Sequence, residues 1–479
     1  MKKKELFLLL FLFALLQKNF AQDTTALHGK ITLQQCVEAA IKNNDDANRA
    51  GFATETGEVN WQQAKGNMLP FVSGNISHGI NQGRSIDPFT NTYSNQNITF
   101  ANYGLNASVT LWNGAAIKNN IRQNLLSFEA SKMDFQQQKD NITINVILAY
   151  LQVLNNQELL NASTQQVDVT RKQVDRLAIL NKDGAVLPAT YYDLKGQLGN
   201  DELNVVAGKA NLETSKIALV QLMNVPYSKD MELEKINDAM IPILYDATVD
   251  QIYQQALQQL AFVKAADLRK ESADKGIKAA KGLLYPTLSL NGGLGTNYSS
   301  IASLQQLVGT SDQPTDAYVL YNSDKLAVLA PQSTYSSQKI SYANQWSNNF
   351  NSYISLGLQI PILNGLQAKS RLKQATIIEK QAAFSANTTK IQLKQNIEQA
   401  YVNMNESFER YQRLAEQVQD YAESFRSAEV RFNAGAVTSV EYLIAKNNLD
   451  RTSINLIAAK YDYVLRTKVL DFYQGKLTF

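Results

Sequence analysis

The chain has 479 residues, with 46 Lys+Arg, 43 Asp+Glu and a net charge of +3, so it lacks the basic excess of nucleic-acid-binding proteins. His28, His78 and Cys36 are its only histidines and cysteine, which excludes an intramolecular disulfide and leaves too few ligands for an ordinary zinc site. Neither a serine–histidine–aspartate set nor a pair of carboxylates recurs at a useful spacing. We therefore expect neither an enzyme nor a bound metal or cofactor.

The amino terminus has the pattern of a secretory signal peptide. Lysines 2–4 precede an apolar run at 6–16, and Ala21 offers a small residue at a cleavage point. The run is shorter than the roughly 20 apolar residues that a membrane-spanning helix needs. We therefore predict that residues 1–21 are a signal peptide and that the mature chain is exported.

The remaining sequence contains an internal duplication, in which one unit occurs twice. Ala-Lys-Gly at 64–66 returns at 280–282, an offset of 216 residues, and Asn-Gly at 113–114 returns at 364–365, an offset of 251. The difference of 35 residues locates an insertion in a polar loop at 299–349. This duplication predicts two structural repeats, 22–223 and 247–479, joined by a segment at 224–246.

Each repeat is expected to begin with a helix (33–67 and 249–284) and to contain a very long one (115–180 and 366–432). Apolar residues of the second long helix alternate spacings of four and three, the 3.5-residue period of helices packed lengthwise. Tight turns follow at 182–188 and 433–439, where Gly184 and Gly435 end the long helices. Thr438 and Glu441 have the spacing of a capping box that starts the returning helix.

Four segments alternate apolar and small polar residues, as half-exposed β-strands do: 70–80, 103–112, 286–298 and 351–362. Each is about ten residues long, which is the length of a tilted membrane-spanning strand. Aromatic residues cluster near their ends, as in the girdles of membrane barrels. Because about eight strands are needed to close a barrel, several chains must share one, and three copies would supply twelve.

An exported chain with this duplication, these strands and these helices resembles the TolC family of outer-membrane efflux channels. The resemblance is carried by segments 31–44, 64–70 and 280–286, by Asn364-Gly365, and by the turn FNAGAVTSVEYL at 432–443. It implies an α+β, mostly α fold. In that fold a duplicated helix-strand-strand-helix repeat builds a long α-helical coiled-coil barrel, and four strands contribute to a shared 12-stranded transmembrane β-barrel.

The resemblance also implies a homotrimer in the lipid of the outer membrane of a Gram-negative bacterium, with the helical tunnel in the periplasm. Such a trimer is the passive exit duct of a tripartite efflux or type I secretion system. Its partners are a periplasmic adaptor protein and an inner-membrane pump of the RND, ABC or MFS type. Segment 224–246 resembles the equatorial belt of the family.

In this family the tunnel closes at the periplasmic helix tips, at an aperture lined by acidic residues and latched by a tyrosine and an arginine. Glu441 falls at the first acidic position, and Ile444 falls at the second. Phe432 stands in place of the tyrosine and Val437 in place of the arginine, which leaves one acidic ring per trimer. The adaptor contacts of the family map onto the two turns, at Gly184, Ala185, Val186, Gly435, Ala436 and Val437.

Two alternatives stay open from the residues alone. The chain as a whole also fits a periplasmic or surface coiled-coil scaffold without a pore, although the alternating strands argue against it. Glu441 fits a purely structural role as a capping-box residue as well as a role in an aperture.

Overall fold

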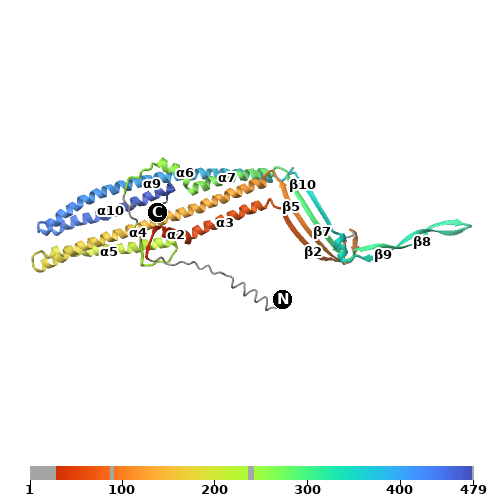
Figure 1. The fold of residues 1–479 in the computed structure, drawn as a ribbon, viewed down its shortest axis with the longest axis horizontal. Helices are drawn as coiled ribbons and strands as arrows, with labels where there is room; N and C mark the ends of the chain where they lie inside the picture. The colour runs from red at the N-terminus through yellow and green to blue at the C-terminus, as the bar shows by residue number, and fades with distance from the viewer. Residues whose placement is uncertain (1–28, 87–90, 96, 236–241, 477–479) are drawn as a thin grey trace, which may run out of the picture. The chain divides into compact units, whose positions relative to one another are not determined.

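The computed structural model describes residues 29–86, 91–95, 97–235 and 242–476, and the predicted signal peptide lies outside them. The chain divides into two compact units. The helical unit comprises the described residues up to Glu58 together with 125–271 and those from 380 onward, and the strand unit comprises 59–124 and 272–379. Figure 1 shows that each unit draws on both halves of the chain. The chain is mostly helical with some strands, as predicted.

The helices α4 (Ala116–Lys182) and α9 (Gln367–Asn433) each run for 67 residues, or about 100 Å at 1.5 Å per residue. Neither sequence contains a proline or glycine that would break it. Amide side chains four residues apart also support them; Gln152, for example, donates to Asn156 at 3.2 Å and Gln399 donates to Asn403 at 2.9 Å. The returning helices are α5 (Pro188–Met223) and α10 (Ser439–Tyr473).

The single helices predicted at 33–67 and 249–284 are wrong, because each is broken into two. The first becomes α2 (Leu33–Asn43) and α3 (Asp45–Gly66), and the second becomes α6 (Val249–Gln259) and α7 (Ala261–Gly282). Asn44 is extended, and its side chain accepts hydrogen bonds from the backbone N–H of Asp46 and Ala47, so it caps α3. Capping boxes start both α2 and α6, at Thr32 and Thr248, so the duplication is visible in three dimensions.

The core of the helical unit gathers around Tyr150 of α4. This side chain is fully buried, and its hydroxyl donates to the carbonyls of Ile31 at 3.1 Å and Glu234 at 2.6 Å. These two residues adjoin a parallel pair of short strands, β1 (Gly29–Ile31) and β6 (Met231–Leu233). The pair ties the described part of the segment between the repeats to the start of the first repeat. Tyr150 shares one buried apolar cluster with residues of both strands and of the neighbouring helices, among them Ile31, Cys36, Val37, Val146, Val153, Leu219, Met223 and Met231.

The strand unit holds an antiparallel sheet in the order β10-β7-β5-β2. Its strands are β2 (Phe71–Asn81), β5 (Ile98–Trp112), β7 (Thr287–Ser299) and β10 (Asn351–Gln359). Compared with the sequence expectation, β5 starts earlier and β10 stops before Pro361, which has no N–H to donate to a ladder. Among the described residues, neither β2 nor β10 pairs with a further strand on its outer edge.

The polar loop expected at 299–349 is instead an ordered insertion. It forms a long antiparallel hairpin of β8 (Ser303–Tyr321) and β9 (Asp324–Lys339), followed by the short helix α8 (Tyr342–Asn348). Asn322 and Ser323 join the strands with φ values of 50° and 71°, the left-handed pair of a two-residue hairpin turn. A smaller hairpin in the first half pairs β3 (Arg84–Ile86) with β4 (Tyr93–Asn95).

Candidate functional site: the helical hairpin tips

The two hairpin tips are built alike. Gly184 and Gly435 have φ values of +67° and +73°, a backbone conformation that residues with a Cβ rarely adopt. In each turn the residue after the glycine donates a hydrogen bond to a carbonyl in the last turn of the long helix. The Ala185 N–H donates to the Leu180 carbonyl and the Ala436 N–H donates to the Arg431 carbonyl, both at 2.8 Å. Gly184, Ala185, Gly435 and Ala436 are exposed, and Val186 and Val437 are half-buried.

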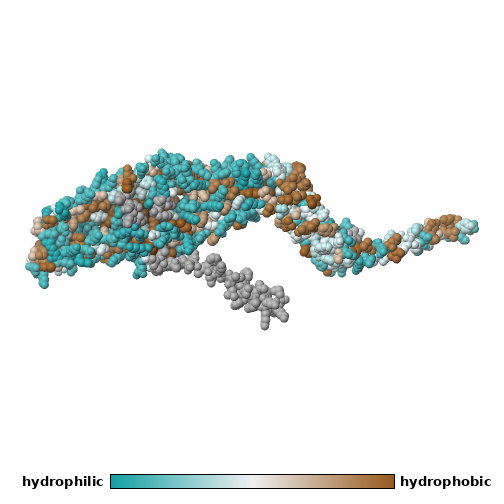
Figure 2. All heavy atoms as spheres, viewed as in Figure 1, coloured by the Kyte–Doolittle hydropathy of each residue, from teal (hydrophilic) through white to brown (hydrophobic). Residues whose placement is uncertain are grey.

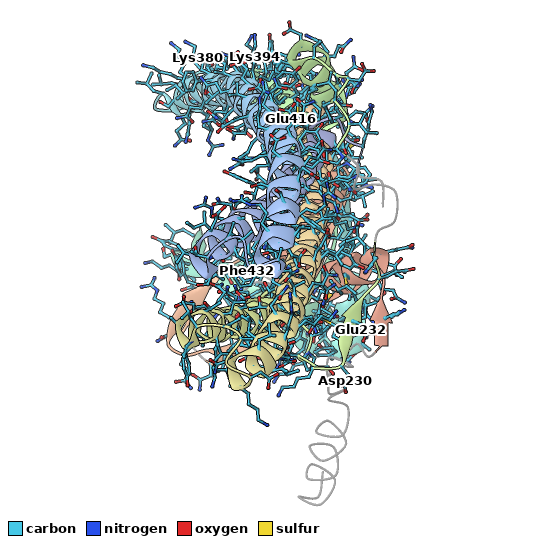
Figure 3. The ribbon with its side chains drawn as sticks, turned by 90° about the vertical axis from the view of Figure 1, so that its left-hand side faces the viewer. Asp230, Glu232, Lys380, Lys394, Glu416 and Phe432 are labelled. Carbon is cyan, nitrogen blue, oxygen red and sulfur yellow. The ribbon has the colours of Figure 1, made fainter. Side chains whose placement is uncertain are left out.

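An apolar cluster lies directly behind the tips and joins both hairpins. Tyr442 of α10 is only 1% exposed, and its ring stacks on Phe432 with centroids 4.7 Å apart. The Phe425 ring also contacts Tyr442, with the ring centroids 5.5 Å apart and the planes tilted. Residues of α4 and α5 complete the cluster, which we call the tip cluster: Val174, Leu177, Leu194, Tyr442 and the partly buried Leu180, Val186, Tyr191, Leu198, Phe425, Phe432 and Leu443. The position of Phe432 at the end of α9 is marked in Figure 3.

Glu441 lies on the surface of the second tip and forms an ion pair. Its carboxylate is 3.0 Å from Nη1 of Arg431, and both side chains are about half exposed. Only half of the predicted capping box forms, because Thr438 accepts from the Glu441 N–H at 3.3 Å while the Glu441 carboxylate turns to Arg431 instead. Ile444 is exposed one turn further along α10. The four aperture candidates therefore divide, with Phe432 in the tip cluster and Glu441, Ile444 and the half-buried Val437 outside its buried centre.

A polar contact links the two long helices beside the tips. Arg176 of α4 donates to both the side-chain oxygen and the backbone carbonyl of Asn433, the last residue of α9, the latter at 3.1 Å. Sequence reasoning missed Arg176, Asn433 and Arg431, because their partners are distant or lie across a turn. Val437 replaces the arginine that the family resemblance led us to expect, but Arg176 and Arg431 supply guanidinium groups at the same tip.

A buried charge network fastens α10 to α5 and α4 behind the tip cluster. The Lys446 ammonium is 3.0 Å from Asp201 of α5 and 2.5 Å from Asp450, and the side chains of Lys446 and Asp201 are 2% and 3% exposed. Asp201 also accepts hydrogen bonds from Thr170 of α4 at 2.5 Å and from Gln197 at 2.7 Å. One buried cation thus serves two carboxylates from different helices, so its loss would leave both without a counter-charge.

Burial raises the pKa of Asp450 above its ordinary value, and the negative charge of Asp201 acts in the same direction while Lys446 partly offsets both. The folded state therefore holds the Asp450 proton more tightly than the unfolded chain does. The tighter proton binding stabilises the folded state. This stabilisation is fully present at pH values below the pKa of Asp450 in the unfolded chain, and it is lost as pH rises through the raised pKa of the folded state. We expect Asp450→Asn to gain stability relative to the parent between about pH 4 and pH 7. Melting temperatures of both proteins at the two pH values check this, and a relative loss at pH 7 would contradict it.

The strand unit exposes an apolar face. Val72 and Ile76 of β2 and Ile354, Leu356 and Leu358 of β10 are between 57% and 85% exposed. Across the register, Val72 pairs with Ala107 and Ile354 pairs with Gly292, so apolar and small residues follow one another over the sheet. Exposed apolar faces of this extent mark a surface that contacts lipid or protein. Figure 2 shows apolar residues along these strands and again along the β8–β9 hairpin. No helix in the described part of the chain is both long and apolar enough to cross a membrane.

Known proteins resemble this chain over most of its length. The family model described as "Outer membrane efflux protein" matches residues 36–225 and 252–475. The chain is 21% identical to the outer membrane protein TolC of Escherichia coli over 76% of its length and 72% of that protein. It is 20% identical to the outer membrane efflux protein BepC of Brucella suis over 95% of its length and 88% of that protein.

Solved structures share the fold at lower identity. A crystal structure of CusC, described as forming a transmembrane channel, matches with a TM-score of 0.74 at 15% identity, over 95% of both chains. The outer membrane protein VceC of Vibrio cholerae matches with a TM-score of 0.72 at 15% identity, over 92% of this chain and 96% of that one. These likenesses show the fold. The family model and the curated relatives are outer-membrane efflux proteins, and they support the channel and not a scaffold without a pore. The chain therefore belongs to the outer membrane efflux protein family, the TolC family of outer-membrane channels.

Proposed function

We propose that three copies of this chain form the passive exit duct of a tripartite efflux or type I secretion system. The observation that carries the proposal is the four-stranded sheet of an outer membrane efflux protein. Its two edge strands have no further partner strand among the residues that the structure describes, and one face of it is exposed and apolar. Backbone groups at an open edge cannot remain unpaired in lipid, so β10 of one copy would pair with β2 of the next. Three copies would close a barrel of twelve strands.

The wall of the helical unit supports a water-filled duct. A groove between α9 and α10 is lined by charged and polar residues together with a leucine and two alanines. Its charged residues include Arg410 and Arg466, which share Asp462 at 2.6 and 3.1 Å. Phe408 is two residues from Arg410 and therefore lies on nearly the opposite face of α9. It packs on Tyr463, with ring centroids 5.0 Å apart, in an apolar cluster that also includes residues of α6. One face of this helix pair is thus covered by apolar packing and the other is charged, as the wall of a wet channel would be.

The partners follow from the family. A tripartite efflux channel works with an adaptor protein and a pump. We propose that the exposed turns at Gly184-Ala185-Val186 and Gly435-Ala436-Val437 contact a periplasmic adaptor, and that an inner-membrane pump of the RND, ABC or MFS type supplies the energy. Within these two triplets the residues are glycine, alanine and valine, without a charged side chain, which fits close packing against another helical tip. Segment 224–246 would form the equatorial belt around the helices.

We propose that Glu441 and Arg431 line the aperture, one pair per copy. At each tip the carboxylate is matched by the guanidinium at 3.0 Å, so the ring in the resting trimer is close to neutral. In this gate the tips are held in place by the aromatic stack of Phe432 and Tyr442 and by the contact of Arg176 with Asn433. The Glu441–Arg431 pairs set the charge at the opening.

Ion selectivity tests this arrangement through two variants of opposite sign. Glu441→Gln leaves three unpaired arginines at the aperture and is expected to shift the reversal potential of the trimer toward anions. Arg431→Gln leaves three unpaired glutamates and is expected to shift it toward cations. The measurement is the reversal potential of purified trimers in planar bilayers under a salt gradient.

Glu423→Gln is the matched control. Glu423 forms an exposed pair with Arg426 on the same helix, at 2.6 Å, in the same Arg–Glu chemistry but away from the tip turn. This control is expected to leave the selectivity unchanged. If Glu441→Gln and Arg431→Gln also leave it unchanged in a conducting trimer, the pair does not line the aperture.

A further inference from the structure

The β8–β9 hairpin, here called the ribbon, accounts for the 35-residue excess of the second repeat. Its two strands pair only with each other among the described residues, from Ser303 opposite Lys339 at the base to Tyr321 opposite Asp324 at the turn. It is seen in Figure 1 as a single pair of strands with nothing packed along it. A two-stranded ribbon is marginally stable in water, so a ribbon of this length needs a further surface.

The base of the ribbon is firmly built. Gln345 of α8 is 1% exposed, and its side-chain amide donates to the carbonyls of Ser299 and Ile340 while accepting from the Ser299 N–H, each at 2.9 Å. The Ile340 N–H closes the base by donating to the Ala302 carbonyl at 3.0 Å. Helix α8 leads straight into β10, so the ribbon is anchored beside the open edge strand of the sheet.

The far end of the ribbon is apolar on both faces. We call residues 317–330 the ribbon tip. Val319 pairs with Leu326 on one face, and Tyr318 pairs with Ala327 on the other. Six of its large apolar side chains are between 52% and 65% exposed: Tyr318, Val319, Leu320, Tyr321, Leu326 and Leu329. Such a density of exposed apolar groups marks an interaction surface, and Figure 2 shows it at the end of the ribbon.

Two features favour identical ribbons as the partner. Prolines interrupt the middle of the ribbon, because Pro314 and Pro331 lack the N–H that an added strand would need, so no strand can be added continuously along the whole ribbon. The only charged residues in the ribbon tip are Asp324 and Lys325, which are adjacent at the turn and have opposite charges. The tip therefore has no net charge, and copies of it do not repel one another. Each ribbon also rises beside β10, the edge along which neighbouring copies would pair.

We propose that the three ribbons of the trimer pack against one another through their tips, burying Leu320 and its apolar neighbours in a shared cluster. The inference rests on the proposed trimer and adds an interface that the barrel does not require. It gives a role to the exposed apolar side chains at the far end of the insertion, beyond the prolines of its middle.

Cysteine cross-linking tests the proposal cleanly. Cys36 is the only native cysteine; it is fully buried, and burial raises the pKa of its thiol to about 12, so it does not react. Leu320→Cys in the full-length purified trimer is expected to form disulfide-linked dimers under mild oxidation, with a yield that does not fall on dilution. Gln306→Cys, near the base and roughly 45 Å away along the ribbon at 3.3 Å per residue, is the matched control and is expected not to cross-link.

A trimer that shows no dilution-independent link at Leu320→Cys overturns the proposal, whatever else covers the tip. Protection of Lys325 from trypsin without such a link would indicate a different partner and would also overturn it. If the protein is not trimeric at all, the proposed function fails first, and the two failures are distinguished by the mass of the purified particle.

Discussion

Lys446→Met is expected to destabilise the helical unit by about 3–5 kcal/mol, because it removes a buried cation from between two carboxylates. The ammonium group is buried between Asp201 and Asp450, at 3.0 and 2.5 Å. Methionine fills a similar volume, but it leaves two carboxylates in a poorly solvated site without a cation. The free energy of unfolding, from urea denaturation followed by the helical circular dichroism signal, checks the expectation.

Two further variants separate the charge effect from a general loss of packing. Lys394→Met removes an exposed lysine of α9 that lies 4.0 Å from Glu398, and it should cost less than about 1 kcal/mol. Combining Lys446→Met with Asp201→Asn and Asp450→Asn removes all the buried charges together and should restore most of the lost stability. Equal, small losses for Lys446→Met and Lys394→Met would show that the buried network does not hold α10 to α5.

Tyr442→Ala is expected to cost about 3–5 kcal/mol and to raise the resting conductance of the trimer, because it empties the centre of the tip cluster. The Tyr442 ring contacts both Phe425 and Phe432 of α9, so its loss frees the end of α9 that carries Asn433 and Arg431. Unfolding free energy and conductance in planar bilayers are the two measurements.

Tyr442→Phe is the matched control. The Tyr442 hydroxyl is buried and finds no hydrogen-bond partner in the described part of the chain, and burial raises its pKa well above the ordinary value. Removing an unpartnered buried hydroxyl while keeping the ring should be neutral or slightly stabilising. A loss from Tyr442→Phe comparable to that from Tyr442→Ala would mean that the hydroxyl, not the ring, supports the tip.

Local signals explain which parts of the fold could be predicted from the sequence. The helices expected at 115–180 and 366–432 are observed as α4 and α9 within two residues at each end, because Asn-Gly dipeptides start them and Gly184 and Gly435 follow them. The break at Asn44 escaped prediction, since it contains neither proline nor glycine and depends on the side chain of Asn44 capping α3. The ribbon escaped because its strands pair over long separations and its turn is Asn-Ser in place of a glycine turn.

The candidate site was harder to predict, because its contacts join residues that are distant in the sequence. The turn residues were located by their glycines, but the partner of each charged residue is fixed by tertiary structure. Glu441 fits a capping box in the sequence, yet Arg431 competes for its carboxylate across the turn. Lys446 and Asp201 are 245 residues apart, and only the packing of α10 on α5 brings them together.

The central claim is that copies of this chain close one channel in the outer membrane. The most direct test is single-channel recording from protein purified from the outer-membrane fraction, with its mass measured in the same preparation. We expect particles with the mass of a trimer that dissociate on heating and conduct ions steadily across a planar bilayer. A protein that is extracted by salt alone, is not trimeric and gives no conductance would contradict it.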